Sequence, residues 1–351
     1  MRILRKLPYA FLLGGLLLSC SQEKKIFADS TLVTYDDFKE VIDLKAEKVG
    51  LDSVLLAPIQ LQVYDTVLAV MNSRADKLVH LFGLGSGMKT AEHVSVGQGP
   101  DEMVVPRFIE NDGRSVQLSD LMTSAVVKYD LPDFFKPEAP VRSERISLKE
   151  RAFGEVRLLK GGYIAPARNT SFLFHVYNVK GERVDSIGGY PEAGWETTDA
   201  EKLNMYTFSF TTNLQDKIAV CYNWTDLVEI YDGAGNLCKR LYGPKQFVSH
   251  FKEVRDGQVI SASPEKGQTR DAYFCPVNMG DEFWVLFSGK SESEENYSIL
   301  ADRICVYGWD GTPRRILNLD EGVFTIAVDK KNRKIYGISD TPEFHMVAFA
   351  Y

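Results

Sequence analysis

A strand-like segment that ends on a large aromatic residue recurs six times in this chain, and this repeat constrains the fold more than any other feature. The copies alternate large apolar residues, as in LVHLFG, AVVKYD, LVEIYDG and RICVYGWDG. The aromatics are Phe82, Tyr129, Tyr177, Tyr231, Tyr307 and Phe349, which lie 47, 48, 54, 76 and 42 residues apart. Six such segments near a period of about 45 residues are typical of four-stranded propeller blades. The repeat therefore predicts an all-β, six-bladed β-propeller in one domain.

Turn residues agree with this prediction. Gly181, Gly235 and Gly311 each stand four residues after an aromatic, where a glycine suits the turn between the third and fourth strands of a blade. Another apolar strand and a polar turn precede each aromatic, as in KIAVCYNWTDLVEIY. Helical periodicity is scarce, and its best candidate, YDDFKEVIDL, is equally compatible with a strand. We therefore expect four-stranded antiparallel blades.

The spacing before Tyr307 and the position of Phe349 need separate explanations. Two polar segments, HFKEVRDGQVISASPEKGQTR and SGKSESEENYSILAD, account for the 76-residue spacing, because lengthening a loop costs only about 0.6 kcal/mol per doubling. Phe349 stands two residues before the last residue, so the last blade lacks an outer strand. We expect the N-terminal segment TLVTYDDFKEVIDLKAEKV to supply this strand and to leave no open edge.

The N-terminus has the layout of an export signal, with a basic start followed by an apolar run from Leu7 to Leu18. This run is shorter than the roughly 20 residues that a membrane-spanning helix requires. It ends in Leu-Leu-Ser-Cys, which resembles the bacterial lipobox. The resemblance implies cleavage before Cys20 and acylation of its thiol. The alternative is an ordinary secretory signal that happens to end near a cysteine.

We therefore predict a lipoprotein signal peptide over residues 1–19, a lipidated tether over 20–30 and the propeller over 31–351. Several acyl chains on Cys20 would give a stable anchor, since a single chain binds membranes only marginally. Ser21 differs from the Asp that, in the best-known sorting rule, retains lipoproteins in the inner membrane. The outer membrane is the expected location, with its sidedness left open.

Charge and cysteine content narrow the classes of protein further. The formal net charge is −7, although the predicted signal contributes only basic side chains, and an acidic surface argues against a nucleic-acid partner. Beyond the lipobox there are four cysteines without metal-binding spacing, Cys221, Cys238, Cys275 and Cys305. The predicted compartment permits disulfides. We nevertheless favour free, buried thiols, because Cys221 and Cys238 are predicted to lie on non-neighbouring strands.

Several longer segments resemble a known family. VGQGPDEMVVPRF looks like the NHL-type turn that leads to a strand headed by proline. DAYFC with DEFWVLFSGK, and RICVYGWDGTPRRIL followed by FTIAVDKKNRKIYGI, extend the likeness. Through them the predicted mature chain resembles the TolB-like six-bladed propeller lipoproteins of Bacteroidetes. The resemblance implies the fold and the anchor but no reaction, because propellers carry many functions.

The sequence predicts no catalytic residue, metal ligand or cofactor. GLGSGMKT lacks the spacing of a phosphate loop, since Met88 separates Gly87 from Lys89, and it leads to a strand rather than a helix. The chain contains no GxSxG or HExxH motif.

Candidate ligand-binding residues come from the loops that enter the innermost strands, because these loops converge on one axial face. They are VGQGPDEMVVPR, IGGYPEAGW, LYGPKQF and the segment that ends in QTRDAYF. From them we select Glu102, Arg107, Lys245 and Arg270 as polar groups able to face the axis, with bonding between blades as the alternative. Trp195 is the tryptophan most expected to be exposed; it is a candidate for stacking on a sugar, although packing at the rim is the simpler interpretation.

Three functions are compatible with these features. The leading one is a binding or scaffold module for a peptide, a glycan or a protein partner of the cell envelope. A calcium-assisted hydrolase or lactonase would need at least three inward carboxylate or amide ligands, of which the sequence offers only Glu110 and Glu155. A purely structural lipoprotein is the third. Polar side chains around an open axial pocket would favour the first two, and an apolar plug the third.

Overall fold

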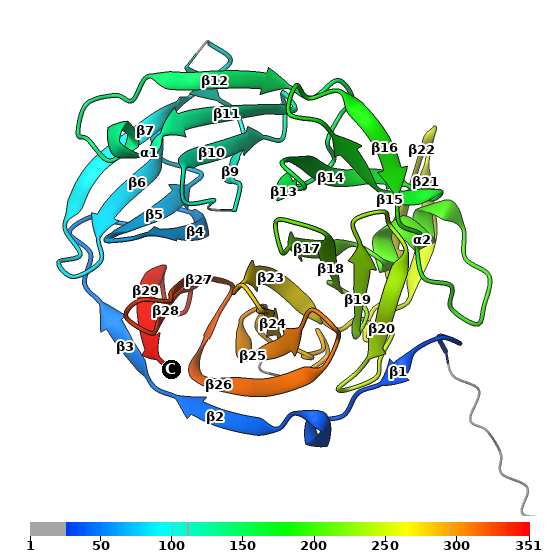
Figure 1. Cartoon of the computed structure of the whole chain (residues 1–351). Helices are drawn as coiled ribbons and strands as arrows, with labels where there is room; N and C mark the ends of the chain where they lie inside the picture. The colour runs from blue at the N-terminus through cyan, green and yellow to red at the C-terminus, as the bar shows by residue number, and fades with distance from the viewer. Residues whose placement is uncertain (1–25, 100, 111, 296) are drawn as a thin grey trace, which may run out of the picture.

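In the computed structural model, residues 26–351 are described, except 100, 111 and 296. Their strands form six blades around a central axis, so the predicted all-β, six-bladed propeller is confirmed (Figure 1). In blades 1–5 four strands pair in an antiparallel manner and in chain order, and in every blade the first strand is nearest the axis.

Blade 1 contains β4 (Pro58–Tyr64), β5 (Val67–Asn72), β6 (Lys77–Gly83) and β7 (Lys89–Val96), and the short β8 (Glu102–Met103) lies parallel to β7. Blade 2 contains β9 (Pro106–Phe108), β10 (Ser115–Asp120), β11 (Ala125–Asp130) and β12 (Arg142–Ser147). Blade 3 contains β13 (Arg157–Leu159), β14 (Gly162–Asn169), β15 (Phe172–Tyr177) and β16 (Arg183–Ile187).

Blade 4 contains β17 (Phe208–Thr212), β18 (Lys217–Tyr222), β19 (Leu227–Asp232) and β20 (Leu237–Tyr242). Blade 5 contains β23 (Tyr273–Asn278), β24 (Glu282–Phe287), β25 (Ala301–Gly308) and β26 (Pro313–Val323). Blade 6 contributes only β27 (Thr325–Asp329), β28 (Lys334–Ser339) and β29 (His345–Ala350) from the C-terminal part of the chain.

The N-terminal segment runs along the outside of three blades and closes the ring (Figure 1). β3 (Ala46–Val49) pairs in an antiparallel manner with β29 and supplies the fourth strand of blade 6, which confirms the predicted closure. β1 (Thr31–Leu32) and β2 (Glu40–Leu44) also join blades 4 and 5, as fifth strands parallel to β20 and β26. The segment YDDFKEVIDL forms a 3-10 turn over Tyr35–Asp37, followed by β2.

The six recurring aromatics have one common structural role. Each lies on the third strand of its blade and is at most 4% exposed. Each belongs to a hydrophobic cluster that joins its own blade to the preceding one, and six such clusters occupy the six interfaces between neighbouring blades. Burying a large apolar side chain contributes about 1.5–3 kcal/mol. The repeat therefore reflects packing between blades.

The glycines that follow three of these aromatics are also required by this packing. Gly181, Gly235 and Gly311 have φ values of 76°, 84° and 82° and lie between the third and fourth strands, as predicted. Each turn touches the preceding blade. A Cβ at position 235, for example, would lie 2.5 Å from the Cβ of Ile187 in blade 3. Glycine is thus needed here for its positive φ and for the close approach.

Two insertions explain the 76-residue spacing. The first forms a hairpin of β21 (Phe251–Asp256) and β22 (Val259–Pro264), whose strands pair only with each other among the described residues. This hairpin packs on α2 (Asp199–Met205). The second is the acidic segment between β24 and β25. The remaining helix, α1 (Leu131–Phe134), follows β11.

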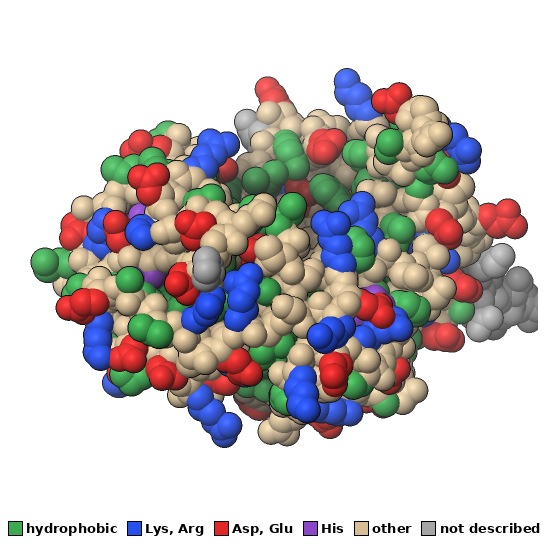
Figure 2. Space-filling model, turned by 90° about the horizontal axis from the view of Figure 1, so that it is seen from above, with side chains coloured by type: hydrophobic (Ala, Val, Ile, Leu, Met, Phe, Trp, Pro, Cys, Tyr) green, Lys and Arg blue, Asp and Glu red, His purple; other side chains and the backbone are tan. Residues whose placement is uncertain are grey.

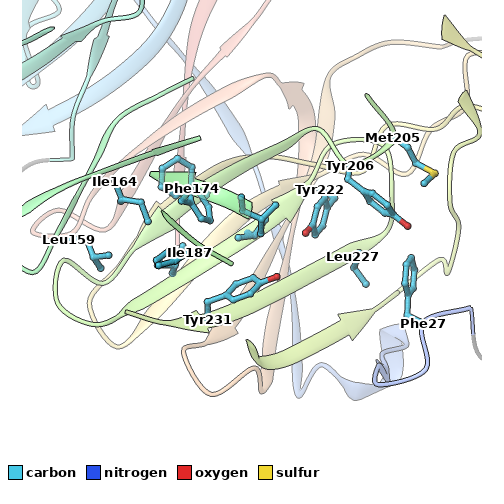
Figure 3. Packing of buried hydrophobic residues seen from close by; sticks show 14 of the residues in the cluster. Phe27, Leu159, Ile164, Phe174, Ile187, Met205, Tyr206, Tyr222, Leu227 and Tyr231 are labelled. Atoms are coloured by element: carbon cyan, nitrogen blue, oxygen red, sulfur yellow. The ribbon is translucent and has the colours of Figure 1, made fainter. Parts of the chain in front are cut away.

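The residues before β1 pack against the propeller from the first described position onward. Phe27 is fully buried between blades 3 and 4, where its ring lies 5.2 Å from that of Tyr242 and also contacts Tyr206 (Figure 3). Cys20 and the predicted signal peptide lie outside the described residues. Within the described chain, no helix has the length and apolar character needed to cross a membrane.

All four cysteines after the lipobox are free, as predicted. Cys221 and Cys305 are buried, and Cys275 is partly buried. The prediction of a buried thiol is wrong for Cys238, which is exposed. It lies near the start of the outer strand β20, whose first two residues are both exposed.

Replacing Gly235 by Ala tests the packing of the recurring turn. We expect Gly235→Ala to lower the free energy of unfolding by about 2 kcal/mol or more, because alanine at positive φ costs about 1–2 kcal/mol and its methyl would meet blade 3. Gly189→Ala is the control, since nothing lies within 4 Å of its Cβ position. Equal stability of the two variants in urea unfolding would contradict this role.

Candidate functional site

The axis of the propeller holds a pocket of about 610 Å³ to which all six blades contribute. Each innermost strand runs from the face where the chain enters the blade, here called the entry face, toward the opposite face. That opposite face carries the turns between first and second strands and is here called the turn face. The pocket is lined mainly by the later parts of the innermost strands and by these turns, as at 62–65, 213–215, 275–280 and 326–331. It therefore opens on the turn face.

Arg157 occupies the inner end of this pocket and connects three blades. It begins β13, the innermost strand of blade 3, and its side chain is 7% exposed. Its Nη1 and Nε atoms donate to the carbonyl oxygens of Phe108 and Phe210, in blades 2 and 4, each at 3.3 Å. Its Nη2 pairs with Glu155, and its Nε lies 3.9 Å from Oε1 of Glu110. The planar guanidinium can serve these separate acceptors at once.

Glu110 is the carboxylate most deeply buried at this end of the pocket. The hydroxyl of Thr211 donates to its Oε1, and that of Thr212 lies 3.4 Å from its Oε2. Burial raises the pKa of the Glu110 carboxyl, while Arg157 and the two hydroxyls oppose that rise. Burial lowers the pKa of Arg157, but the attraction of Glu155 and Glu110 outweighs it and raises the pKa overall. The mutual attraction of Arg157 and Glu110 thus opposes the cost of burying both charges beside the axis.

Lys330 and Gln215 lie at the mouth of the pocket and have free polar groups. Lys331 pairs with Asp65 at 3.2 Å, whereas Lys330 has no ion-pair partner within 4.0 Å among the described residues. Desolvation lowers the pKa of the Lys330 ammonium, and Asp281 partly offsets this. Gln215 is exposed, and its side-chain amide has no hydrogen bond to the described residues. Both groups are therefore available to a ligand.

The other amides that line the pocket are engaged in structural bonds. Both polar atoms of the Gln60 amide bond to the backbone of Phe108, which joins blades 1 and 2. Asn213 accepts three backbone N–H groups in its own turn. Asn278 accepts from Gly280 at 2.8 Å. Between them lie apolar side chains, which include Leu61, Val63, Pro276, Val277 and Met279. The wall is thus mixed in polarity.

The structure separates the four candidate residues selected from the sequence. Arg107 lies on β9 beside the axis, with its Nε 4.0 Å from Oε1 of Glu155, and burial lowers its pKa. Glu102 lies on β8 at the outer edge of blade 1, where its carboxylate accepts from the backbone N–H of Gly99. The structure therefore places Arg107 near the axis and Glu102 away from it.

Lys245 and Arg270 meet on the entry face between blades 4 and 5. Lys245 Nζ and Arg270 Nη1 donate to the carbonyl oxygen of Gly289 at 2.8 and 3.1 Å. Arg270 also pairs with Glu294 at 3.2 Å. Desolvation and the nearby Arg303 and Arg270 lower the pKa of Lys245. These two cations join the segments around them rather than line the axial pocket.

The two carboxylates considered for a calcium site are both near the axis. They face Arg157. Among the residues that the structure describes, no group of three or more His, Cys, Asp or Glu side chains is arranged to hold a metal ion.

Sequence reasoning missed Arg157, Gln215 and Lys330. Gln215 and Lys330 were missed because the pocket opens on the turn face, whereas the sequence pointed to loops of the entry face; Arg157, which begins β13, lies after an entry loop that was not among those selected. A signal was present in the polar turns that directly follow innermost strands, as in TTNLQD and VDKKNR. These turns resemble ordinary hairpin turns, and only their convergence around the axis distinguishes them.

The surface has no dominant charge on the side drawn in Figure 2. Acidic and basic side chains are interspersed there, without a continuous region of one sign.

Six blades around an axial pocket of mixed polarity define a six-bladed β-propeller. The family model described as TolB-like 6-blade propeller-like matches residues 37–331, and the chain belongs to this family. This confirms the resemblance noted in the sequence.

Solved structures match this chain at low identity. A member of the DUF4221 family from Bacteroides vulgatus is 10% identical, with a TM-score of 0.53, over 88% of this chain and 95% of that one. A putative exported protein from Bacteroides fragilis is 11% identical, with a TM-score of 0.44, over 88% and 98% of the two chains. The chain has no significant match among curated protein sequences.

Arg157→Met tests the role of the central guanidinium. Removing one member of a buried ion pair costs about 3–5 kcal/mol, so we expect a loss of stability of that size. The loss should grow as the pH rises above 4.5, the ordinary pKa of Glu110, because the carboxylate must then ionise without its partner. Adding Glu110→Gln should restore part of the stability and weaken this pH dependence. A small loss, independent of pH, would contradict the role of Arg157 in holding the Glu110 charge.

Proposed function

We propose that the protein is a lipid-anchored binding module of the cell envelope whose axial pocket takes a small polar ligand, such as part of a peptide or a glycan. The observation that carries this proposal is the pocket of about 610 Å³ on the turn face, built by all six blades. Ligand sites commonly have volumes of about 300–1,000 Å³ and combine apolar walls with a few polar groups.

The side chains around the pocket support a ligand that carries an anionic group. Lys330 provides a free cation at the mouth, and Gln215 provides an amide that can both donate and accept. The deeper charges of Arg157, Glu110 and Glu155 already satisfy one another. A negative group on the ligand would therefore be recognised at the mouth, while its neutral part contacts Leu61, Val63 and Met279 on the walls.

The position of the first described residues is compatible with the proposed anchor at Cys20. Ile26 follows that cysteine by six residues and already packs on the propeller. An acylated cysteine so close to the domain would hold the propeller at a membrane surface. The outer membrane is the proposed location.

Lys330→Met tests the binding proposal. Full-length protein is applied to glycan and peptide arrays, and the best ligand is then titrated by calorimetry. We expect Lys330→Met to weaken binding about tenfold or more, because a hydrogen bond to a charged group contributes about 1.5–3 kcal/mol. Gln215→Ala should weaken it less.

Lys180→Met is the control for this experiment, because Lys180 lies in the exposed turn between the outer two strands of blade 3. It should leave the affinity unchanged. Arrays without a ligand, or affinity unaffected by both mouth variants, would count against axial binding.

Cys20→Ser tests the anchor. In cells fed a labelled fatty acid, wild-type protein should carry the label and sediment with membranes, and Cys20→Ser should lose both properties. Cys238→Ser, which removes an exposed thiol on β20, should retain both. Label that persists in Cys20→Ser would contradict acylation at this site.

A further inference from the structure

The described chain begins on the entry face, at the interface between blades 3 and 4. Ile26 and Phe27 belong to a cluster that also contains Tyr206, at the end of α2, and Phe251, at the base of the β21–β22 hairpin. The carbonyl oxygen of Ile26 lies beside Gly194, 4.0 Å from its Cβ position. Because α2, the loop around Gly194 and the hairpin all connect an outer strand to the next innermost strand, the N-terminal segment reaches the propeller on the entry face.

The proposed anchor lies close to this point. Ile26 lies six positions after Cys20, and an extended chain spans at most about 3.6 Å per residue, so the two Cα atoms lie within about 22 Å of each other. This step rests on the proposed acylation of Cys20. If Cys20 is acylated, the region around Ile26 must lie close to the membrane and face it.

Exposed apolar side chains lie on two segments that border this region, the loop around Gly194 and the β21–β22 hairpin. Trp195 is 37% exposed and stacks on His250 with ring centroids 5.2 Å apart. In the hairpin, Val254 is 43% exposed, Val259 65% and Ile260 53%. Val259 and Ile260 directly follow the turn at the tip of the hairpin. A group of exposed large apolar residues on one projection commonly marks a binding surface.

The hairpin has no role in a blade that would account for these residues. Its two strands pair only with each other among the described residues, and it is held at its base by α2. Of its charged side chains, Arg255 pairs with Glu253 at 2.7 Å and Lys252 with Glu265, whereas Asp256, next to the turn, has no ion-pair partner within 4.0 Å among the described residues. The projection therefore carries exposed apolar residues beside a polar tip and is balanced in charge.

We infer that Trp195 and the tip of the β21–β22 hairpin contact the lipid surface to which Cys20 is anchored. Tryptophan is favoured at membrane interfaces, because its ring is apolar and its N–H can bond to head groups or water. Each contact is weak, but the short tether keeps the surface at a high effective concentration. The entry face then lies toward the bilayer, and the axial pocket opens away from it.

Tryptophan quenching by brominated lipid tests this orientation. Full-length lipidated protein is reconstituted into vesicles of phosphatidylethanolamine and phosphatidylglycerol that contain dibrominated phosphatidylcholine, and binding is measured separately by flotation. Wild-type fluorescence should be quenched. Trp195→Phe should lose most of this quenching and still float. Val259→Ser with Ile260→Ser should reduce quenching of Trp195, whereas Val141→Ser, at an exposed position next to blade 2, should not.

The possible outcomes distinguish the proposed membrane-contact surface from the proposed anchor at Cys20. If the protein floats but quenching is equal in wild type and Trp195→Phe, the proposed contact surface is wrong, whereas the proposed anchor is unaffected. Protein that is not acylated and does not float would overturn both. Flotation with quenching that depends on Trp195 and on the hairpin tip would support the inference.

Discussion

The structure depends on closing a ring of six blades whose last blade is built from both ends of the described chain. Blade 6 is complete only when β3 pairs with β29, through the register from Ala46 opposite Phe349 to Val49 opposite Met346. The same N-terminal segment first adds β1 to blade 4 and β2 to blade 5. Its backbone thus covers the outer edges of three consecutive blades, which would otherwise remain unpaired. Closure also fixes how far apart the innermost strands lie across the axis, and hence the size of the pocket.

Packing between neighbouring blades explains why the aromatic residues recur, and the geometry at the axis explains where the pocket lies. The recurring aromatics fill the interfaces between blades, so their period follows the period of the blades. At the axis the innermost strands cannot pair with one another, and side chains must bridge them. Arg157 does so between blades 2, 3 and 4, and Gln60 between blades 1 and 2. What remains open beyond these bridges is the pocket of the turn face.

The proposed anchor, the proposed membrane contact and the proposed ligand site form one spatial arrangement. Ile26, Trp195 and the hairpin lie together on the entry face, whereas Gln215 and Lys330 lie at the mouth on the turn face. A propeller held by its entry face would present its pocket to the compartment rather than to the lipid. In such an arrangement, binding at the mouth would not compete with anchoring.

The sequence by itself determined the fold, because the aromatic period, the glycine four residues later and the missing outer strand each report local packing rules that hold in every blade. It also indicated the free cysteines and the polar insertions before Tyr307. It did not identify the parallel strands β1 and β2, whose pairing has no hairpin signal. Nor did it identify the site: Arg107 and Glu102 stand five residues apart, yet one lies beside the axis and the other at an outer edge. Only the tertiary structure brought Gln215 and Lys330 to one opening, because the closed ring decides which of many similar turns converge.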